Sequence, residues 1–280
     1  MKALCLMATC PLCLFAAWAA PAVKSGFVTT SDGIRLHYLE SGSGPAILFV
    51  PGWTMPAEIW EPQIRYFAQR YRVVALDPRS QGASTQATEG HYPERRARDI
   101  KEVVDQLKLS PAVLVGWSLG VPEALTYVDQ FGTATLRALA LVDGRIYSDP
   151  SPRQWDWVKA MQLNRTEFAA GFVRSMYKKP QSEAYYQKIT AASLKTPTNT
   201  AVTLLANVYA KGDWRPVLAK LDRPVLYAIT PALKAQGEIL KTKVPSARVE
   251  IFEDAGHALF VDEAARFNAL LEDFAQRAPR

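Results

Sequence analysis

Hydrophobic residues occur along this chain in short continuous runs that alternate with longer segments of helical periodicity. The short runs are rich in aliphatic and β-branched side chains, which is typical of strands. They predict strands at residues 34–39, 46–50, 73–76, 112–115, 136–142, 225–229 and 248–252. Helical patterns lie between them and include residues 94–107, 119–130 and 259–276.

The predicted strands are apolar at successive positions, not at every second position. The runs AVLV at 112–115 and ALALV at 138–142 contain no polar side chain that could face water. Strands that are buried on both faces are typical of parallel sheets with helices on both sides. The sequence therefore predicts an α/β fold with a mostly parallel, doubly wound sheet.

The alternation of strands and helices is interrupted once, between residues 144 and 213. This segment has helical periodicity only and is rich in aromatic residues, among them Trp155 and Trp157. We expect a helical cap over the carboxyl ends of the strands, where open α/β sheets bind ligands. The core domain would then consist of residues 23–143 and 214–280.

The N-terminus resembles a secretory signal peptide. Lys2 is followed by an uncharged, largely apolar stretch that ends in small residues, which favours cleavage after Ala19 or Ala22. The alternative is an uncleaved membrane anchor, but the stretch is of marginal length for a span and Pro11 interrupts it. We expect residues 1–22 to be a signal peptide, a secreted or periplasmic location, and no stable membrane association after cleavage.

Removal of the predicted signal peptide would change both the cysteine content and the net charge of the protein. All three cysteines precede residue 14, so the mature protein would contain neither a thiol nor a disulfide. The 33 Lys and Arg against 27 Asp and Glu give a net charge of +6, which becomes +5 (32 − 27) without Lys2. No long basic run is present, so we do not expect nucleic-acid binding.

One motif of the sequence predicts a reactive serine. Residues 116–120 read Gly-Trp-Ser-Leu-Gly, directly after a predicted strand and before a predicted helix. Glycines two positions to either side allow Ser118 to occupy a sharp turn that presents its hydroxyl above the sheet. The first amides of the following helix then face any negative charge that develops there.

With this motif the chain resembles the α/β-hydrolase superfamily over nearly its whole length after residue 22. Three further segments match motifs of that family, namely 49–53, 77–84 and 254–261. Two positions depart from the family pattern, because Pro51 replaces a histidine and Ser80 replaces a glycine. Neither position performs chemistry in the family, so these departures concern the subfamily and not the reaction.

The resemblance implies that Ser118 is the nucleophile and His257 the general base. It also implies an oxyanion hole formed by the backbone amides of Trp53 and Leu119. The residues support the choice of base independently, since the chain has only three histidines. His37 lies in a predicted strand, as an ordinary sheet residue, and His91 lies in a polar loop, where we expect it to be solvated.

The acid of the triad is left open by the sequence. The family usually places it after the strand at 225–229, but no aspartate follows there and Glu238 is the first carboxylate. Asp143 ends the preceding strand, and neighbouring strands lie about 4.8 Å apart, so it could orient the histidine from that position. We favour Asp143, with Glu238, another residue or no acid as the alternatives.

Other charged residues receive structural interpretations. Asp77 and Arg79 lie in a loop that is structural in the family, where such a pair more often holds backbone than substrate. The charged run at 94–99 is interpreted as a solvated helix face.

A serine at this turn argues against the aspartate-dependent branches of the superfamily, because the covalent ester in those branches needs a carboxylate there. The sequence favours hydrolysis of a small carboxylic ester with an apolar or aromatic group through an acyl-serine intermediate. Lactone or amide hydrolysis and cofactor-free perhydrolysis use the same triad, and a non-catalytic binding protein is the alternative from another class. The substrate-binding candidates are Trp53, Trp117, Trp155 and Trp157.

The sequence contains neither a metal-ligand cluster nor a glycine-rich phosphate loop, so we expect no metal and no cofactor. It leaves the oligomeric state open.

Overall fold

A sheet of eight strands forms the centre of the part of the chain that the structure describes. The structure is a computed structural model, and it describes residues 21–148 and 153–279. The strand order is β1-β2-β4-β3-β5-β6-β7-β8, with β2 antiparallel to both of its neighbours and β3 to β8 parallel to one another. The strands are β1 (Lys24–Thr29), β2 (Arg35–Ser41), β3 (Ala46–Val50), β4 (Arg72–Leu76), β5 (Ala112–Trp117), β6 (Leu136–Val142), β7 (Val225–Ile229) and β8 (Arg248–Ile251).

The apolar runs predict the strands closely. Three of them, β3, β6 and β7, have the predicted bounds, and four others differ by at most two residues at either end. The pattern of apolar runs does not predict β1. This strand pairs only with β2 at the edge of the sheet, and Val28 is its one buried residue, so it has no apolar run.

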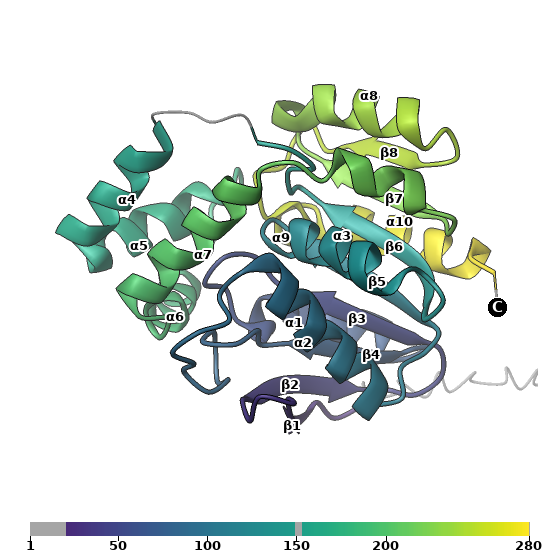
Figure 1. Ribbon diagram of the computed structural model, residues 1–280, viewed down its shortest axis with the longest axis horizontal. Helices are drawn as coiled ribbons and strands as arrows, with labels where there is room; N and C mark the ends of the chain where they lie inside the picture. Colours follow the sequence, from purple (N-terminus) through teal and green to yellow (C-terminus); the bar gives the residue numbers. More distant parts are fainter. Residues whose placement is uncertain (1–20, 149–152, 280) are drawn as a thin grey trace, which may run out of the picture.

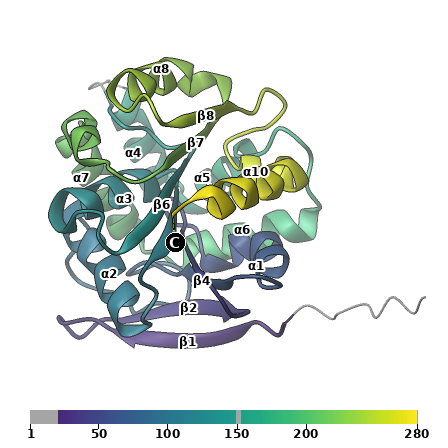
Figure 2. The ribbon, with the colours of Figure 1, turned by 90° about the vertical axis from the view of Figure 1, so that its right-hand side faces the viewer.

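Helices cover both faces of the sheet, which confirms the predicted doubly wound α/β fold. Along β3, Ile47 and Phe49 face one helical layer, whereas Leu48 and Val50 face the other. Figure 2 shows the sheet between these layers. The first layer contains α1 (Glu61–Phe67), α9 (Leu259–Asp262) and α10 (Ala264–Arg277), and the second contains α2 (Pro93–Gln106), α3 (Gly120–Phe131) and α8 (Lys234–Lys243). The 3-10 helices are η1 (Ala57–Trp60), η2 (Arg215–Lys220) and η3 (Pro231–Leu233).

The helix predicted at 259–276 is two helices, α9 and α10, with a break at Glu263 (φ −123°, ψ 49°). The reason lies in Asp262, whose buried carboxylate accepts hydrogen bonds from the backbone N–H groups of Lys178 (2.7 Å) and Gly256 (2.8 Å). These long-range contacts hold the end of α9 against another part of the chain, and the apolar pattern contains no sign of them.

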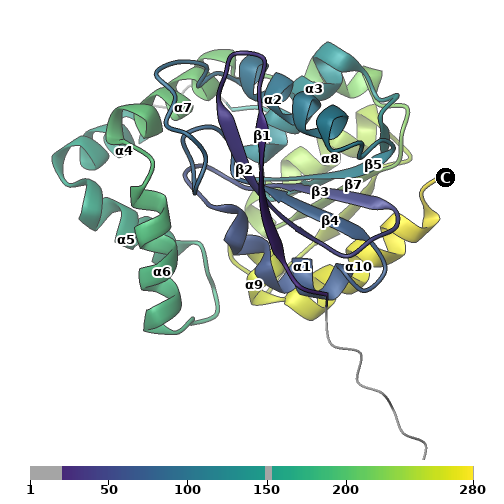
Figure 3. The same ribbon diagram turned by 90° about the horizontal axis from the view of Figure 1, so that it is seen from below.

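Four helices form an insertion between β6 and β7, in the region where the sequence predicts a helical cap. They are α4 (Arg153–Leu163), α5 (Arg165–Ser175), α6 (Glu183–Leu194) and α7 (Thr198–Lys211). Figures 1 and 3 show them beside the sheet and outside its two helical layers. Tyr147 and Asp213 form a β-bridge that brings the two ends of the insertion together. Side chains of the insertion, including Met161 and Leu204, pack on Trp53 and Leu119, which follow β3 and β5.

The predicted signal peptide lies outside the described residues, except for Pro21 and Ala22. Within residues 21–148 and 153–279, no helix combines the length and the apolar character needed to cross a bilayer.

The prediction of a solvated charged face at 94–99 holds for the exposed Arg98 but is wrong for two other charged residues. Arg96 and Asp99 are both buried, because α2 packs against α3 and against the loop that follows β4. Arg96 forms an ion pair with Glu123 of α3, and the fully buried Arg79 forms one with Asp99 at 2.6 Å. Charges inside a protein persist only when they are paired and hydrogen-bonded, and each of these has such partners.

His91 is buried beside this network. The prediction that it is solvated, made from the polar residues around it, is therefore wrong. Its Nε2 lies 2.9 Å from Oγ of Ser80, the residue that replaces the family's glycine and has a left-handed backbone (φ 64°). Burial, together with the positive charges of Arg96 and Arg79, lowers the pKa of His91 from 6.5 to about 4.

This pKa predicts a pH dependence of stability. Between about pH 6.5 and 4 the unfolded chain protonates His91 and the folded chain does not, so the free energy of unfolding falls as the pH decreases. The loss attributable to His91 reaches about 3 kcal/mol. In urea titrations, His91→Gln should lose less stability than the wild type over this range. Parallel pH profiles of the two proteins would contradict the assignment.

Candidate active site

Ser118 lies in a tight turn between β5 and α3 and has a left-handed backbone (φ 56°). Glycine is required on both sides of it. A Cβ on Gly116 would lie 2.3 Å from the carbonyl oxygen of Gly120, and a Cβ on Gly120 would lie 2.6 Å from that of Val50. The turn therefore has the predicted strand–turn–helix form, and its glycines allow backbone segments to approach closely.

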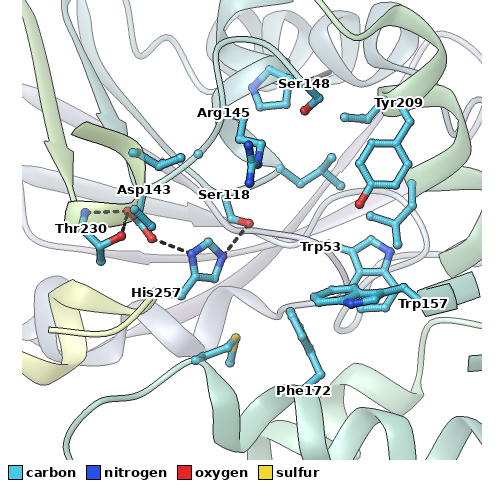
Figure 4. A pocket seen from close by; sticks show the side chains of 18 of the residues that line it. Trp53, Ser118, Asp143, Arg145, Ser148, Trp157, Phe172, Tyr209, Thr230 and His257 are labelled. Atoms are coloured by element: carbon cyan, nitrogen blue, oxygen red, sulfur yellow. Dashed lines mark hydrogen bonds and ion pairs between the residues drawn. The ribbon is translucent and has the colours of Figure 1, made fainter. Parts of the chain in front are cut away.

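Three side chains that the sequence analysis selected form a continuous chain of hydrogen bonds (Figure 4). Nε2 of His257 lies 2.8 Å from Oγ of Ser118, and Nδ1 lies 2.8 Å from Oδ2 of Asp143. An Nδ1–H that donates to the carboxylate leaves Nε2 free to accept the serine proton. The three residues come from the ends of β5 and β6 and from the loop after β8, which are distant in sequence and meet at one edge of the sheet.

Asp143 is held by a residue that the sequence analysis missed. Its other oxygen, Oδ1, accepts hydrogen bonds from the backbone N–H and the hydroxyl of Thr230, at 2.7 and 2.8 Å. Thr230 directly follows β7, at the position where the family usually has its acid. Its place directly after β7 is the feature of the sequence that could have identified Thr230 as a site residue. Glu238 is exposed on α8 and does not line the cavity, so the geometry favours Asp143 as the partner of His257.

The turn after β3 packs directly against the serine. A Cβ on Gly52 would lie 2.8 Å from Cβ of Ser118, so only glycine fits here. The next residue, Trp53, and the residue after the serine, Leu119, have backbone N–H groups without a hydrogen-bond partner among the described residues. Both groups are therefore available to an oxygen atom of a bound ligand.

Ser118 and His257 line a cavity of about 350 Å³ between the sheet and the insertion. Its walls are mostly apolar, as is usual for small-molecule sites. The predicted residues Trp53 and Trp157 line it, whereas Trp155 is largely exposed (65%) and lies outside it. The lining residues that the sequence analysis did not select include Pro122, Arg145, Ser148, Phe172, Met176, Leu205, Val208, Tyr209 and Leu233.

The assignment of Trp117 to substrate binding needs correction. Its side chain is buried on the α1/α9/α10 face of the sheet and does not line the cavity. Successive side chains at the end of β5 point in different directions. Trp117 therefore points away from the cavity, whereas Ser118 faces it. Nε1 of Trp117 donates a hydrogen bond to the carbonyl oxygen of His257 at 2.9 Å. This residue therefore supports the histidine loop.

The helical insertion also supports the site. Nε1 of Trp53 donates to the carbonyl oxygen of Ala201 in α7 at 2.8 Å, and the Arg165 guanidinium of α5 lies 5.5 Å from the centre of the Trp53 rings. The histidine loop is attached through Ala258, whose N–H donates to the carbonyl oxygen of Met176 at 2.8 Å. The positions of both predicted site segments therefore depend on the insertion.

The remaining candidates have structural partners. Nδ1 of His37 lies 2.7 Å from Oδ2 of Asp77 and its Nε2 lies 2.8 Å from Oγ of Ser25, so it is the satisfied sheet residue that the sequence predicts. Asp77 also accepts a hydrogen bond from the backbone N–H of Ala83 at 2.8 Å. Within residues 21–148 and 153–279, no group of three or more His, Cys, Asp or Glu side chains is arranged to hold a metal ion.

Comparison with known proteins agrees with this architecture. The chain is 27% identical to a non-heme haloperoxidase from Rhodococcus erythropolis, over 89% of this chain and 98% of the relative. It is 38% identical to a bifunctional esterase/perhydrolase from Acinetobacter calcoaceticus, over 38% of this chain and 40% of the relative. An esterase structure from Exiguobacterium antarcticum superimposes with a TM-score of 0.83 at 24% identity, covering 89% of this chain and 98% of that one. Residues 47–270 match the profile of the alpha/beta hydrolase family, and the chain therefore belongs to that family.

Proposed function

We propose that this protein is a serine hydrolase that cleaves a carboxylic ester through an acyl-enzyme on Ser118. The observation that carries the proposal is the chain of hydrogen bonds Ser118–His257–Asp143. All three residues line a largely apolar cavity. The relatives named as esterases agree with this reaction.

In the acylation step, Oγ of Ser118 attacks the carbonyl carbon of the ester while Nε2 of His257 takes up its proton. Asp143, with its second oxygen held by Thr230, stabilises the resulting imidazolium. The carbonyl oxygen becomes an oxyanion that accepts hydrogen bonds from the amides of Trp53 and Leu119. His257 then donates its proton to the departing alkoxide as the ester C–O bond breaks.

In the deacylation step, His257 removes a proton from a water molecule that attacks the acyl-enzyme carbonyl. The bond to Oγ of Ser118 breaks, and the serine regains a proton from His257 while the carboxylic acid leaves. The wall of the cavity formed by Trp53, Trp157 and Phe172 suits an apolar or aromatic group on the substrate.

Covalent labelling separates this proposal from a binding protein without catalysis. We expect a fluorophosphonate to label the wild type on Ser118, as located by peptide mass spectrometry, and not to label Ser118→Ala. The labelled protein should also lose its activity on p-nitrophenyl esters. Absence of labelling in the folded wild type would contradict the proposal.

The identity of the acid is tested by a pair of isosteric substitutions. Asp143→Asn should lower kcat on the same esters by about four orders of magnitude, because the histidine loses the carboxylate that sets its tautomer. Glu238→Gln is the matched control and should leave kcat near that of the wild type, since Glu238 is exposed and lies outside the cavity. The reverse order of the two effects would overturn the assignment.

Perhydrolysis is a second candidate, favoured by the relatives named as haloperoxidases and as an esterase/perhydrolase. Here hydrogen peroxide replaces water, so His257 takes its proton and the acyl group leaves Ser118 as a peracid. With an acetate ester and peroxide, we expect bromide-dependent bromination of monochlorodimedone that Ser118→Ala lacks. Equal bromination by the two proteins would exclude this activity of the site.

We also propose that residues 1–22 direct export, so that the mature enzyme acts in the periplasm or outside the cell. The charge and hydrophobicity pattern of the N-terminus supports this location.

A further inference from the structure

Arg145 contributes a positive charge to the wall of the cavity. It lies two residues after Asp143 and lines the same cavity as Ser118 and His257. Figure 4 shows its side chain extending from its loop toward Ser118. Within the described residues its guanidinium has neither a hydrogen bond nor an ion pair, in contrast to the paired Arg79 and Arg96.

The backbone that carries Arg145 is held firmly on both sides. Gly144 packs so closely that a Cβ there would lie 2.3 Å from the carbonyl oxygen of Ser118. On the other side, the N–H of Ile146 donates to Oε1 of Gln236 at 2.7 Å, and its carbonyl oxygen accepts from the N–H of Trp214 at 2.9 Å. The starting point of the side chain is therefore fixed relative to Ser118.

Among the described residues that line the cavity, no acidic side chain is free to neutralise this charge. Asp143 is the one carboxylate among the lining residues, and its two oxygens bond with His257 and Thr230. The charge of Arg145 acts on Tyr209 of α7. Burial raises the pKa of the Tyr209 hydroxyl, and Arg145 opposes that rise. Arg145 is exposed to solvent at the wall of this largely apolar cavity, where its charge attracts an anionic group of the ligand.

We propose that Arg145 binds a carboxylate of the substrate, so that the preferred ester carries a second, ionised carboxyl group beside an apolar or aromatic body. This inference rests on the proposed ester hydrolysis at Ser118. A planar guanidinium can donate two parallel hydrogen bonds to a carboxylate, which gives both affinity and orientation. Trp53, Trp157 and Phe172 would contact the apolar body.

Two pairs of substrates test this and show which side of the ester is recognised. In 4-acetoxybenzoate the carboxylate lies on the leaving group, and its methyl ester is the neutral partner. In monomethyl adipate it lies on the acyl group, with dimethyl adipate as the neutral partner. In at least one pair, Arg145→Gln should lower kcat/KM for the anionic ester by about 10-fold to 100-fold, the value of one charge-assisted contact. The neutral partner should change by less than about threefold.

Two further variants sharpen the result. Arg145→Lys should retain part of the preference, because it keeps the charge and loses the planar pair of donors. Arg98→Gln removes one positive charge from an exposed position on α2 and should change neither substrate pair.

If Arg145→Gln affects the anionic and neutral esters equally in both pairs, the assignment of Arg145 is wrong while the esterase activity stands. If the wild type hydrolyses neither member of either pair and resists fluorophosphonate, the proposed function fails, and the carboxylate site fails with it.

Discussion

The left-handed backbone of Ser118 is the constraint on which the rest of the site depends. Around it, glycines at positions 52, 116, 120 and 144 allow the ends of three strands to meet within distances that no Cβ would permit. This packing presents the hydroxyl to the cavity, directs the turn after β3 toward it, and sets the start of the loop after β6. One close approach of backbone thus positions the predicted nucleophile, the oxyanion donors and the acid together.

The helical insertion contributes to the geometry of the site as well as covering it. Its helix α7 holds the indole of Trp53, and the segment after α5 holds the histidine loop through Met176 and Asp262. Trp117 also holds that loop, through its hydrogen bond to the carbonyl oxygen of His257. A change in the position of the insertion would therefore disturb both the candidate oxyanion donors and the candidate base.

Charge is distributed in two ways in this molecule. In the interior, arginines such as Arg79 and Arg96 are paired with carboxylates and hold loops and helices together. At the cavity, the Arg145 guanidinium has no partner within the described residues and lines the same wall space as the candidate nucleophile. Because a lone cation costs little at a solvated opening and gains much from an anionic ligand, it suits selection among substrates.

The sequence by itself determined the features that short stretches of chain encode. Continuous apolar runs predicted seven of the strands and the doubly wound sheet, and the glycines around Ser118 predicted the turn. It could not decide between Asp143 and Glu238, because that choice depends on which strand end lies beside His257 and on Thr230 from a third strand. The burial of His91, Arg96 and Asp99, and the orientation of Trp117, were also decided only by tertiary structure. Hydrophobic periodicity indicates the secondary structure of a single segment. The burial of a side chain, its hydrogen-bond partners and its access to a cavity depend on segments that are distant in sequence and adjacent in space.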